Sequence, residues 1–489
     1  MALKRTTGFL AAALAATLTA TTLAACSQST TPQPGAGTGS QSDSGSNTTG
    51  SGAPGSGATG SNTTGFDEKK FSGQTIHVML DEHPWTDGVQ QHLKEFTAAT
   101  GITVDLKTYS EDLYFDKVDQ ALRSNNPPDV YMTGLDFDAA SQFSAGLMEP
   151  LTPYIDDATK TPADYDIADF PKGTLQPAEF PSGDPSAKLY AIPVSTETYI
   201  LFYNKDLVDK YLGGTVPQTM DDLIKAAATV TEKAGGEVYG SVMRGVRSAD
   251  SIMDTMTGMV FNELPASIKP ELPYGVWWDG DWSKPRLTDP AIVKGVADYA
   301  ALVKSGPPNS LNIDWPDSTA LFQQGKAAFY VDASVFGPSF EDTSKSTVAG
   351  HVGYATLPKA SPDGTTGLWS WGLAMAKASP RHDAAWMFMQ YFTNKKMTAT
   401  LGALTGGAPR GSATSDPAYT GALNADYVAA VGKAMSTARP TAILNGNAEP
   451  ALTDIVDAMI AISQGQAPDK AMADAQTKVQ AQAGQLAAE

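Results

Sequence analysis

Three β-strands are predicted by the segments TIHVML (75–80), ITVDL (102–106) and DVYMT (129–133). Helical patterns lie between them, because apolar residues recur at three- and four-residue spacing after the first segment and again after the second. This βαβαβ alternation predicts a parallel sheet covered by helices. Ligands of such sheets bind beyond the carboxyl ends of the strands. We therefore expect functional residues in Asp81–Trp85 and in Gly134–Asp138.

The rest of the folded sequence continues the mixture of strands and helices. Strands are expected at Leu189–Val194, Tyr199–Tyr203, Ala327–Asp332, Val352–Thr356 and Trp369–Ala376. Thr219 and Asp222 form a capping-box pair that opens a helix, and Asp289-Pro290 supplies a cap and a first-turn proline for another. Proline also begins three later helices, which are expected at Pro380–Thr393, Pro450–Gln464 and Pro468–Leu486.

The N-terminus has the layout of a secretory signal. Lys4 and Arg5 precede an apolar run that ends in Leu23-Ala24-Ala25-Cys26, and Cys26 is the only cysteine. This tetrad resembles the lipobox of bacterial lipoproteins, which implies a signal peptide over 1–25 and lipidation of Cys26. An ordinary cleavage site with an incidental cysteine is the alternative.

Residues 26–66 are expected to form a disordered tether behind the lipid. They consist almost wholly of Ser, Thr, Gly, Gln, Asn, Pro and Ala, which cannot bury enough apolar surface to offset ordering entropy. About 40 such residues reach on the order of 35 Å. The interpretation is a protein of the cell membrane of a Gram-positive bacterium, which faces the extracellular side.

The charge of the chain restricts its partners. Removal of Lys4 and Arg5 with the signal peptide brings the formal charge from −19 to −21. So acidic a chain is not expected to bind nucleic acid or anionic lipid surfaces. No later segment has the ~20 apolar residues of a membrane helix, so the lipid is the one expected membrane contact. The remaining length exceeds what one hydrophobic core usually serves, which favours two lobes.

Three later segments carry a more specific pattern. The first is YILFYNKDL (199–207), followed by VPQTMDDL (216–223). The second is ALFQQGKAAF (320–329), which leads to Asp332, and the third is WSWGLAM (369–375) with Ala384-Ala385-Trp386 beyond it. Together they resemble the extracellular solute-binding proteins of sugar-importing ABC transporters, the family that includes the maltose-binding proteins. Trp369-x-Trp371 and Arg244-Gly245 are most similar to the branch that binds sugar alcohols such as sorbitol and mannitol.

The resemblance implies an α/β fold of type II: two lobes, each a mainly parallel sheet flanked by helices, joined by hinge strands. It places 67–185 with 336–395 in lobe 1 and 186–335 with 396–489 in lobe 2. It further implies a monomeric receptor that binds a sugar alcohol, monosaccharide or short oligosaccharide. The receptor would deliver this ligand to permease subunits driven by a cytoplasmic ATPase.

Carbohydrates stack their C–H faces on aromatic rings and pair their hydroxyls with polar groups. Trp369 and Trp371 alternate along a strand and therefore share one face, and Trp85 follows a strand end. The alternative for these tryptophans is core packing. The resemblance adds Glu197, Arg244 and Asp332, with Arg410 as a further candidate. An ion pair with a nearby acid is the alternative for Arg244, and a hinge hydrogen bond to backbone is the alternative for Asp332.

Catalytic and metal patterns are poor, so we predict neither an enzyme nor a cofactor. The five histidines form no cluster at metal-ligand spacing. For His83, beside Asp81 and Glu82, we favour a solvated loop over a metal ligand. Two alternatives remain open. A glycoside hydrolase would need two carboxylates some 5–10 Å apart, and a solute-binding protein could also take a ligand other than a sugar.

Overall fold

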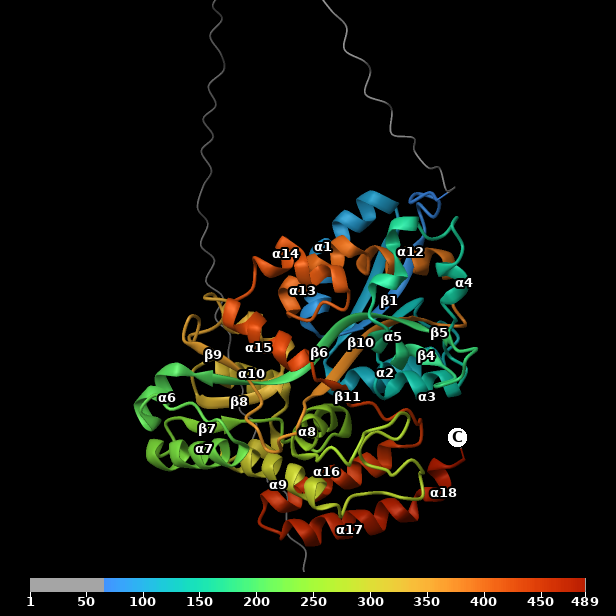
Figure 1. Ribbon diagram of the computed structural model, residues 1–489. Helices are drawn as coiled ribbons and strands as arrows, with labels where there is room; N and C mark the ends of the chain where they lie inside the picture. Colours follow the sequence, from blue (N-terminus) through green and yellow to red (C-terminus); the bar gives the residue numbers. More distant parts are fainter. Residues whose placement is uncertain (1–65, 489) are drawn as a thin grey trace, which may run out of the picture. The chain divides into compact units, whose positions relative to one another are not determined.

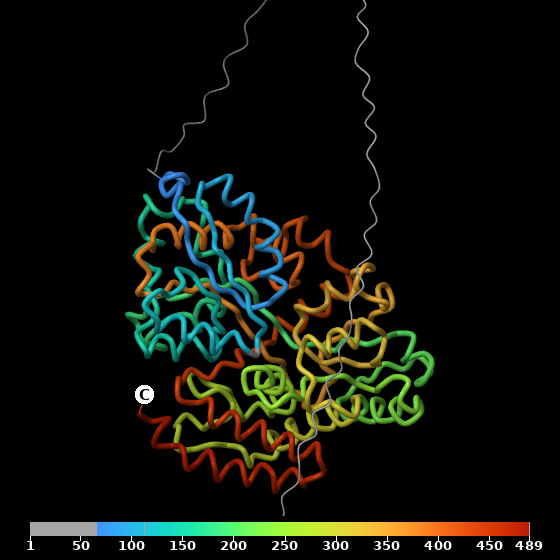
Figure 2. The backbone as a smooth tube through the Cα atoms, turned by 180° about the vertical axis from the view of Figure 1, so that it is seen from behind, coloured from blue at the N-terminus to red at the C-terminus, as the bar shows by residue number. Residues whose placement is uncertain are grey.

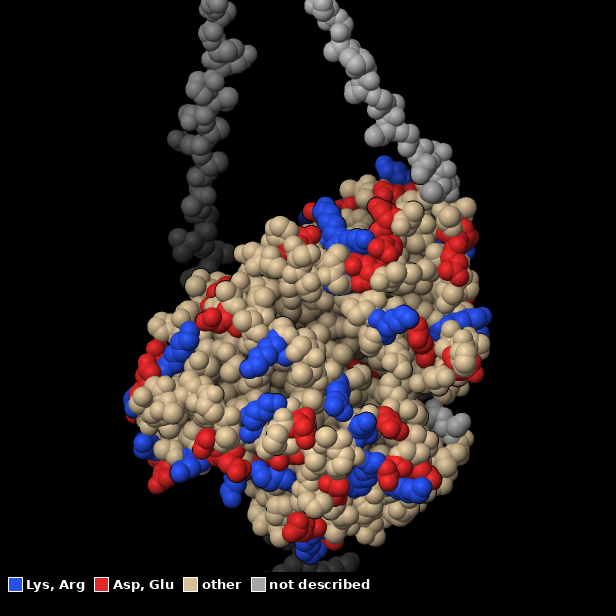
Figure 3. Space-filling view, viewed as in Figure 1, with Lys and Arg blue, Asp and Glu red and all other residues tan. Residues whose placement is uncertain are grey.

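The computed structural model describes residues 66–488 (Figure 1), and these residues belong to one compact unit. The predictions for the signal peptide, for Cys26 and for the tether before Phe66 lie outside the described residues. Within 66–488, no helix combines the length and the apolar character needed to cross a membrane. On the face shown in Figure 3, basic and acidic side chains are interspersed and form no continuous basic surface.

The N-terminal strands form the predicted parallel arrangement. Strand β1 (Thr75–Asp81) lies between β2 (Thr103–Tyr109) and β3 (Val130–Gly134), and it is parallel to both. Helix α1 (Pro84–Thr100) connects β1 to β2, and α2 (Glu111–Leu122) connects β2 to β3. The βαβαβ prediction is confirmed, and the carboxyl ends of β1 and β3 lie at one edge of the sheet.

A single strand, β6 (Ala191–Asn204), runs through the middle of the sheet. Its first half pairs with β10 (Gly367–Met375), and its second half pairs with β8 (Ala327–Ala333) and β9 (Val352–Thr356). The prediction of two separate strands here was wrong. The predicted strands ended at Val194 and began again at Tyr199, yet the four polar residues between them, 195–198, are all buried inside the strand.

The complete sheet is mixed, so the expectation of a mainly parallel sheet in each lobe is correct for β1–β3 but wrong for the half formed by β6, β8 and β9. Strand β10 is antiparallel to β3 and β6, and β6 is antiparallel to β8 and β9. Strand β7 (Tyr239–Val242) extends the far edge in parallel with β8, and β11 (Arg439–Pro440) adds two residues beside β10. Strands β4 (Glu179–Phe180) and β5 (Lys188–Leu189) pair separately.

Helices cover this sheet. Those of seven or more residues that follow α2 are α3 (Asp138–Ser144), α6 (Lys205–Leu212), α7 (Met220–Ala234), α8 (Ala249–Glu263), α9 (Pro290–Lys304), α10 (Trp315–Gln323), α12 (His382–Phe392), α13 (Lys395–Thr405), α15 (Ala425–Met435), α16 (Glu449–Ser463) and α17 (Pro468–Ala481). The short ones are α4 (Thr152–Ile155), α5 (Lys172–Leu175), α11 (Gly337–Phe340), α14 (Pro417–Thr420) and α18 (Ala483–Leu486).

Most sequence signals at helix termini proved accurate, but α12 begins at His382, two residues after the predicted start at Pro380. Thr219 Oγ1 accepts a hydrogen bond from the Asp222 N–H at 3.2 Å, and α7 begins after it. Asp289 accepts from the Ala291 N–H at 3.0 Å, and α9 begins at Pro290. Helix α8 was not predicted, because 13 of its 15 residues are buried and it therefore has no one-sided apolar stripe.

Two hydrophobic cores lie along β6. Phe96, Val130 and Trp386 belong to the first, and Val260 and Trp277 belong to the second. Most apolar residues of β6, such as Ile192 and Ile200, belong to the first core, and Leu201 belongs to the second. In Figure 2 the blue and orange segments lie together, as do the green, yellow and red ones. Strand β6 is thus the common element of both halves.

Gly240 on β7 tests the packing of this second half. A Cβ at Gly240 would lie 1.7 Å from the backbone oxygen of Ala227 on α7. We expect Gly240→Ala to destabilise the protein by about 2–3 kcal/mol or more, because backbone has to move. Gly173→Ala is the control, since its Cβ would meet nothing within 4 Å. Urea unfolding should separate the two, and equal stabilities would contradict this packing.

Lys294 links two acidic side chains, Glu263 on α8 and Asp298 on α9. Asp298 is 5% exposed and accepts hydrogen bonds from Lys294 Nζ at 2.8 Å on both carboxylate oxygens. Lys294 also lies 3.5 Å from Glu263 Oε1. Burial, reinforced by the hydrogen bond with Glu263, raises the pKa of Asp298 to about 7.

This raised pKa predicts a pH dependence of stability. The folded state binds the Asp298 proton more tightly than the unfolded state, so the contribution is complete below pH ~4 and is lost as pH rises through about 7. We expect a loss of roughly 2–4 kcal/mol across this window. Asp298→Asn should flatten the dependence, and exposed Asp209→Asn should not. Unfolding free energies measured from pH 4 to 8 check this; an unchanged slope in Asp298→Asn would contradict it.

Candidate functional site

Polar and aromatic side chains converge where β1 and β3 end and where β6 passes from β10 to β8. His83, just beyond β1, bonds to Glu197 on β6 and contacts Trp371 on β10. Trp371 in turn pairs with Gly134, the last residue of β3. These are the strand ends at which the sequence predicted functional residues.

Asp81, the last residue of β1, is the most unusual member of this group. It is fully buried, and among the described residues neither of its carboxylate oxygens has a hydrogen-bond partner. Burial raises its pKa well above the usual value, and the charges of Glu82, Glu197 and Asp314 raise it further. A buried polar group without a partner is costly, so any hydrogen-bond donor that reaches Asp81 is strongly favoured.

Glu197 lies in the middle of β6, opposite Trp369 of β10. Its Oε1 accepts hydrogen bonds from His83 Nε2 at 3.0 Å and from Ser195 Oγ at 3.3 Å. Within 66–488, no hydrogen bond reaches Oε2. One oxygen of this carboxylate is therefore fixed by the protein, and the other remains available.

Aromatic rings accompany these carboxylates. Trp369 and Trp371 meet edge to face at 5.5 Å between ring centroids, which confirms that both lie on one face of β10. Trp371 stacks on Phe115 of α2 at 5.8 Å with 12° between the planes, and Trp369 contacts Phe137 at 5.2 Å. Gly134 leaves room for Trp369, because a Cβ there would lie 2.9 Å from its ring.

Arg244 and Asp332 pair with each other. Arg244 Nη2 lies 2.7 Å from Asp332 Oδ1, and Nε lies 3.0 Å from Oδ2. Tyr330 and the Ala333 N–H also donate to this carboxylate, each at 2.7 Å. Both alternatives left open by the sequence are thus present: an ion pair for Arg244 and a backbone hydrogen bond for Asp332. A ligand contact of these two residues stays a prediction.

Asp254 of α8 borders this ion pair. Its Oδ2 accepts from Tyr199 OH at 2.8 Å and lies 3.8 Å from Arg244 Nη1. Burial raises the pKa of Asp254 to about 6, although Arg244 opposes the shift. Arg244 therefore interacts with both Asp332 and Asp254, and few of its N–H groups remain to bind an anionic ligand.

Glu111 links the two groups electrostatically. Burial raises its pKa well above the usual value, the charges of Asp81 and Asp314 raise it further, and Arg244 lowers it. These acids therefore act on one another, and the cation that lowers the pKa of Glu111, Arg244, is already paired with Asp332. Such surroundings favour a ligand that donates hydrogen bonds.

Trp85 and Arg410 have mainly structural surroundings. Trp85 is 1% exposed and belongs to the first core, and its backbone N–H donates to His83 Nδ1 at 3.0 Å. Arg410 donates to the backbone oxygens of Thr393 and Asp166, at 2.7 and 2.8 Å, and lies 4.0 Å from the Phe170 ring. The contacts recorded for Arg410 include none of the acids at the ends of β1 and β3. A ligand role for Trp85 or Arg410 stays a prediction.

The structure corrects the interpretation of His83 as part of a solvated loop. We favoured a solvated loop for it, but His83 is 7% exposed and forms the N-cap of α1. The signal that we missed was Pro84, because proline at the first helical position marks the residue before it as a cap. Within 66–488, no group of three or more His, Cys, Asp or Glu side chains could hold a metal ion.

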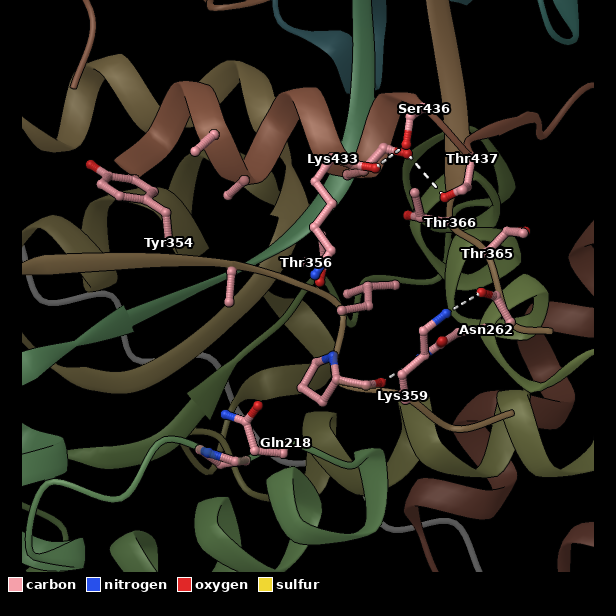
Figure 4. A pocket seen from close by; sticks show the side chains of 18 of the residues that line it. Gln218, Asn262, Tyr354, Thr356, Lys359, Thr365, Thr366, Lys433, Ser436 and Thr437 are labelled. Carbon is pink, nitrogen blue, oxygen red and sulfur yellow. Dashed lines mark hydrogen bonds between the residues drawn. The ribbon is translucent and has the colours of Figure 1, made fainter. Parts of the chain in front are cut away.

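A pocket of about 680 Å³ opens elsewhere, between β9, α15 and the segment after β9 (Figure 4). Lys433 extends from α15 toward Thr356, and Lys359 Nζ donates to the Gly364 oxygen at 2.7 Å. None of the predicted site residues lines it, nor does any buried polar side chain found without a partner in 66–488. We therefore regard the group around Asp81, Glu197 and Trp371 as the candidate site.

Two relatives are similar to this chain over more than half of its length. An erythritol/L-threitol-binding protein of Mycolicibacterium smegmatis is 29% identical over 340 residues, which are 68% of this chain and 69% of the relative. A mannitol-binding protein of Pseudomonas aeruginosa is 30% identical over 263 residues, which are 53% of this chain and 55% of that protein.

Solved structures show the same fold. An ABC transporter solute-binding protein of Agrobacterium vitis with bound D-mannitol superposes with a TM-score of 0.70 at 24% identity, over 84% of this chain and 99% of that one. One of Agrobacterium radiobacter in complex with ribitol gives 0.70 at 23%, with the same coverage. The two-lobed type II fold expected from the sequence is confirmed.

A sequence model of a protein family matches most of the described residues and establishes the family of this chain. The model for bacterial extracellular solute-binding proteins matches residues 83–399, a span that includes β6, β8 and β10 with Glu197, Asp332 and Trp371. The resemblance noted in the sequence is therefore confirmed, and the chain belongs to the bacterial extracellular solute-binding protein family.

Proposed function

We propose that the chain is an extracellular receptor that binds a sugar alcohol or a small sugar and delivers it to an ABC importer. One observation carries the proposal: the buried carboxyl group of Asp81 has no partner among the described residues, and Glu197, with one free oxygen, lies near it. The relatives that bind erythritol, L-threitol or mannitol support the same ligand class.

The chemistry of a polyol suits these groups. Each hydroxyl can donate to a carboxylate oxygen, and such charge-assisted bonds are stronger than neutral ones. The C–H faces of the same molecule pack against Trp371 and Trp369. A sugar acid or a sugar phosphate would bring negative charge to a site whose one nearby arginine, Arg244, is already paired. We therefore favour an uncharged ligand.

Strand β6 supplies the hinge in this proposal. Ligand contacts from both halves of the sheet favour a closed state over an open one, and the ligand shifts that equilibrium by its differential affinity. The lobe boundaries predicted from the sequence remain part of the proposal. The pairing of β9 with the second half of β6 favours extending lobe 2 to about Thr356.

The membrane arrangement is also proposed. Lipidated Cys26 and the tether over 26–66 would hold a monomeric receptor beside its permease subunits and their ATPase. The anchor replaces free diffusion with a high local concentration. A signal peptide over 1–25 and a Gram-positive source fit this arrangement, as does membrane contact through the lipid alone.

We further propose that the chain is not an enzyme. A glycoside hydrolase needs one carboxyl group as acid and a second as base or nucleophile, some 5–10 Å apart. Asp81 and Glu197 are the pair that this alternative would use. Release of a chromophore from aryl glycosides, abolished in Asp81→Asn, would establish the hydrolase; we expect no release.

The ligand site is tested by isothermal titration with erythritol, ribitol and D-mannitol. We expect Asp81→Asn and Glu197→Gln each to weaken binding about 10- to 100-fold, because each replaces a carboxyl oxygen that can accept a ligand hydroxyl with an amide N–H that cannot. Lys433→Ala, in the pocket of Figure 4, is the control and should bind as the unmodified chain does. Unchanged affinity in both acid variants would place the site elsewhere.

The anchor is tested separately with Cys26→Ser. This variant should keep its affinity for the polyol and leave the membrane fraction, because the thiol is the one lipid attachment point. Fractionation of cells with an antibody to the protein measures it. A Cys26→Ser chain that stays in the membrane fraction would contradict the anchor without touching the ligand site.

A further inference from the structure

His83 occupies a constrained position between β1 and α1. Its Nδ1 lies 3.0 Å from the backbone nitrogen of Trp85, and a backbone N–H can only donate. Nδ1 is therefore the acceptor, and the proton of the neutral ring is on Nε2. That Nε2–H points to Glu197 Oε1 at 3.0 Å. The start of α1 thus determines which nitrogen faces Glu197.

The ring itself is held from the side. The centroid of His83 lies 5.9 Å from that of Trp371, with 57° between the planes, and Trp371 stacks on Phe115. His83 and Glu197 are both less than one-tenth exposed. The donor therefore cannot swing into solvent, and its direction toward Glu197 is fixed by packing as well as by the cap.

The consequence appears at Glu197. Ser195 Oγ is the second donor to the same Oε1, at 3.3 Å. With two protein donors on Oε1, the carboxyl group is held in one orientation. Oε2 then has one fixed position, and no hydrogen bond from residues 66–488 reaches it.

We propose that His83 is a positioning residue for the ligand: its Nε2–H holds Glu197 so that Oε2 accepts a hydroxyl of the bound polyol. This inference rests on the proposed function. It assigns to His83 a role through Glu197, without contact between His83 and the ligand. Neighbouring Asp81 has no comparable donor, so the two carboxyl groups differ in what they offer.

His83→Asn separates the two roles of the side chain. Asparagine is a good N-cap and keeps an acceptor for the start of α1, but it is too short to reach Glu197. We expect the Tm to change by less than about 2 °C and the Kd for erythritol or D-mannitol to rise about tenfold. His92→Asn is the matched control, because His92 bonds to Glu95 on its own helix at 3.1 Å.

A double-mutant cycle gives the decisive measurement. If His83 acts through Glu197, the chain with both His83→Asn and Glu197→Gln binds no more weakly than Glu197→Gln alone. Additive losses, or an unchanged Kd in His83→Asn, would overturn the inference while the ligand site stands. Failure of the unmodified chain to bind any polyol would overturn the proposed function and this inference together.

A second readout needs no ligand. Nitrogen-15 NMR of the full chain should show His83 with its proton on Nε2 and with Nδ1 unprotonated. A proton on Nδ1 would exclude the hydrogen bond from Trp85 and overturn the inference, whatever the binding data show.

Discussion

The continuity of β6 is the constraint on which the rest of the molecule depends. Fourteen residues in one strand are shared by two groups of neighbours, β10 along the first half and β8 with β9 along the second. A strand in this position has to be buried almost throughout, so polar residues in its middle need partners from the surrounding elements. Ser195 and Glu197 find theirs in each other and in His83, and this requirement brings the β1–α1 corner to the centre of the sheet.

Buried charge is distributed unequally around that centre. Toward the second half of the sheet, Arg244 is surrounded by Asp332, Asp254 and the Ser251 oxygen, so its donors are used. Toward the first half, Asp81 has no donor among the described residues. A buried ion pair whose hydrogen bonds are all made contributes rigidity and specificity more than net stability. An unpaired buried carboxyl group instead favours the binding of any hydrogen-bond donor that reaches it. The same kind of side chain is thus fully paired on one side and without a hydrogen-bond partner on the other.

Much of this could be predicted from the sequence, and the exceptions have physical causes. Helix caps at Thr219 and Asp289 are local signals, and both were read correctly. The middle of β6 was not predicted as strand because residues 195–198 are polar, whereas a buried strand is expected to be apolar. Helix α8 was not predicted because a helix that is buried on all sides shows no periodic alternation of apolar and polar residues. The positions of Glu197 and Trp371 came from a resemblance, while the roles of Asp81 and His83 depend on contacts between distant segments, which no local pattern encodes.

The unpaired carboxyl group of Asp81 has a consequence for the empty receptor. Taking such a group out of water carries a desolvation penalty that no side-chain donor among the described residues offsets, and the nearby Glu82 backbone N–H opposes it only in part. In the receptor proposed above, water that reaches Asp81 would relieve this penalty and would therefore compete with the polyol. The open state then gains free energy from wetting the site, and the closed state gains it only when hydroxyl groups replace the water. A receptor of this kind would therefore resist closing without ligand, and fewer receptors in the closed but unloaded state would reach the importer.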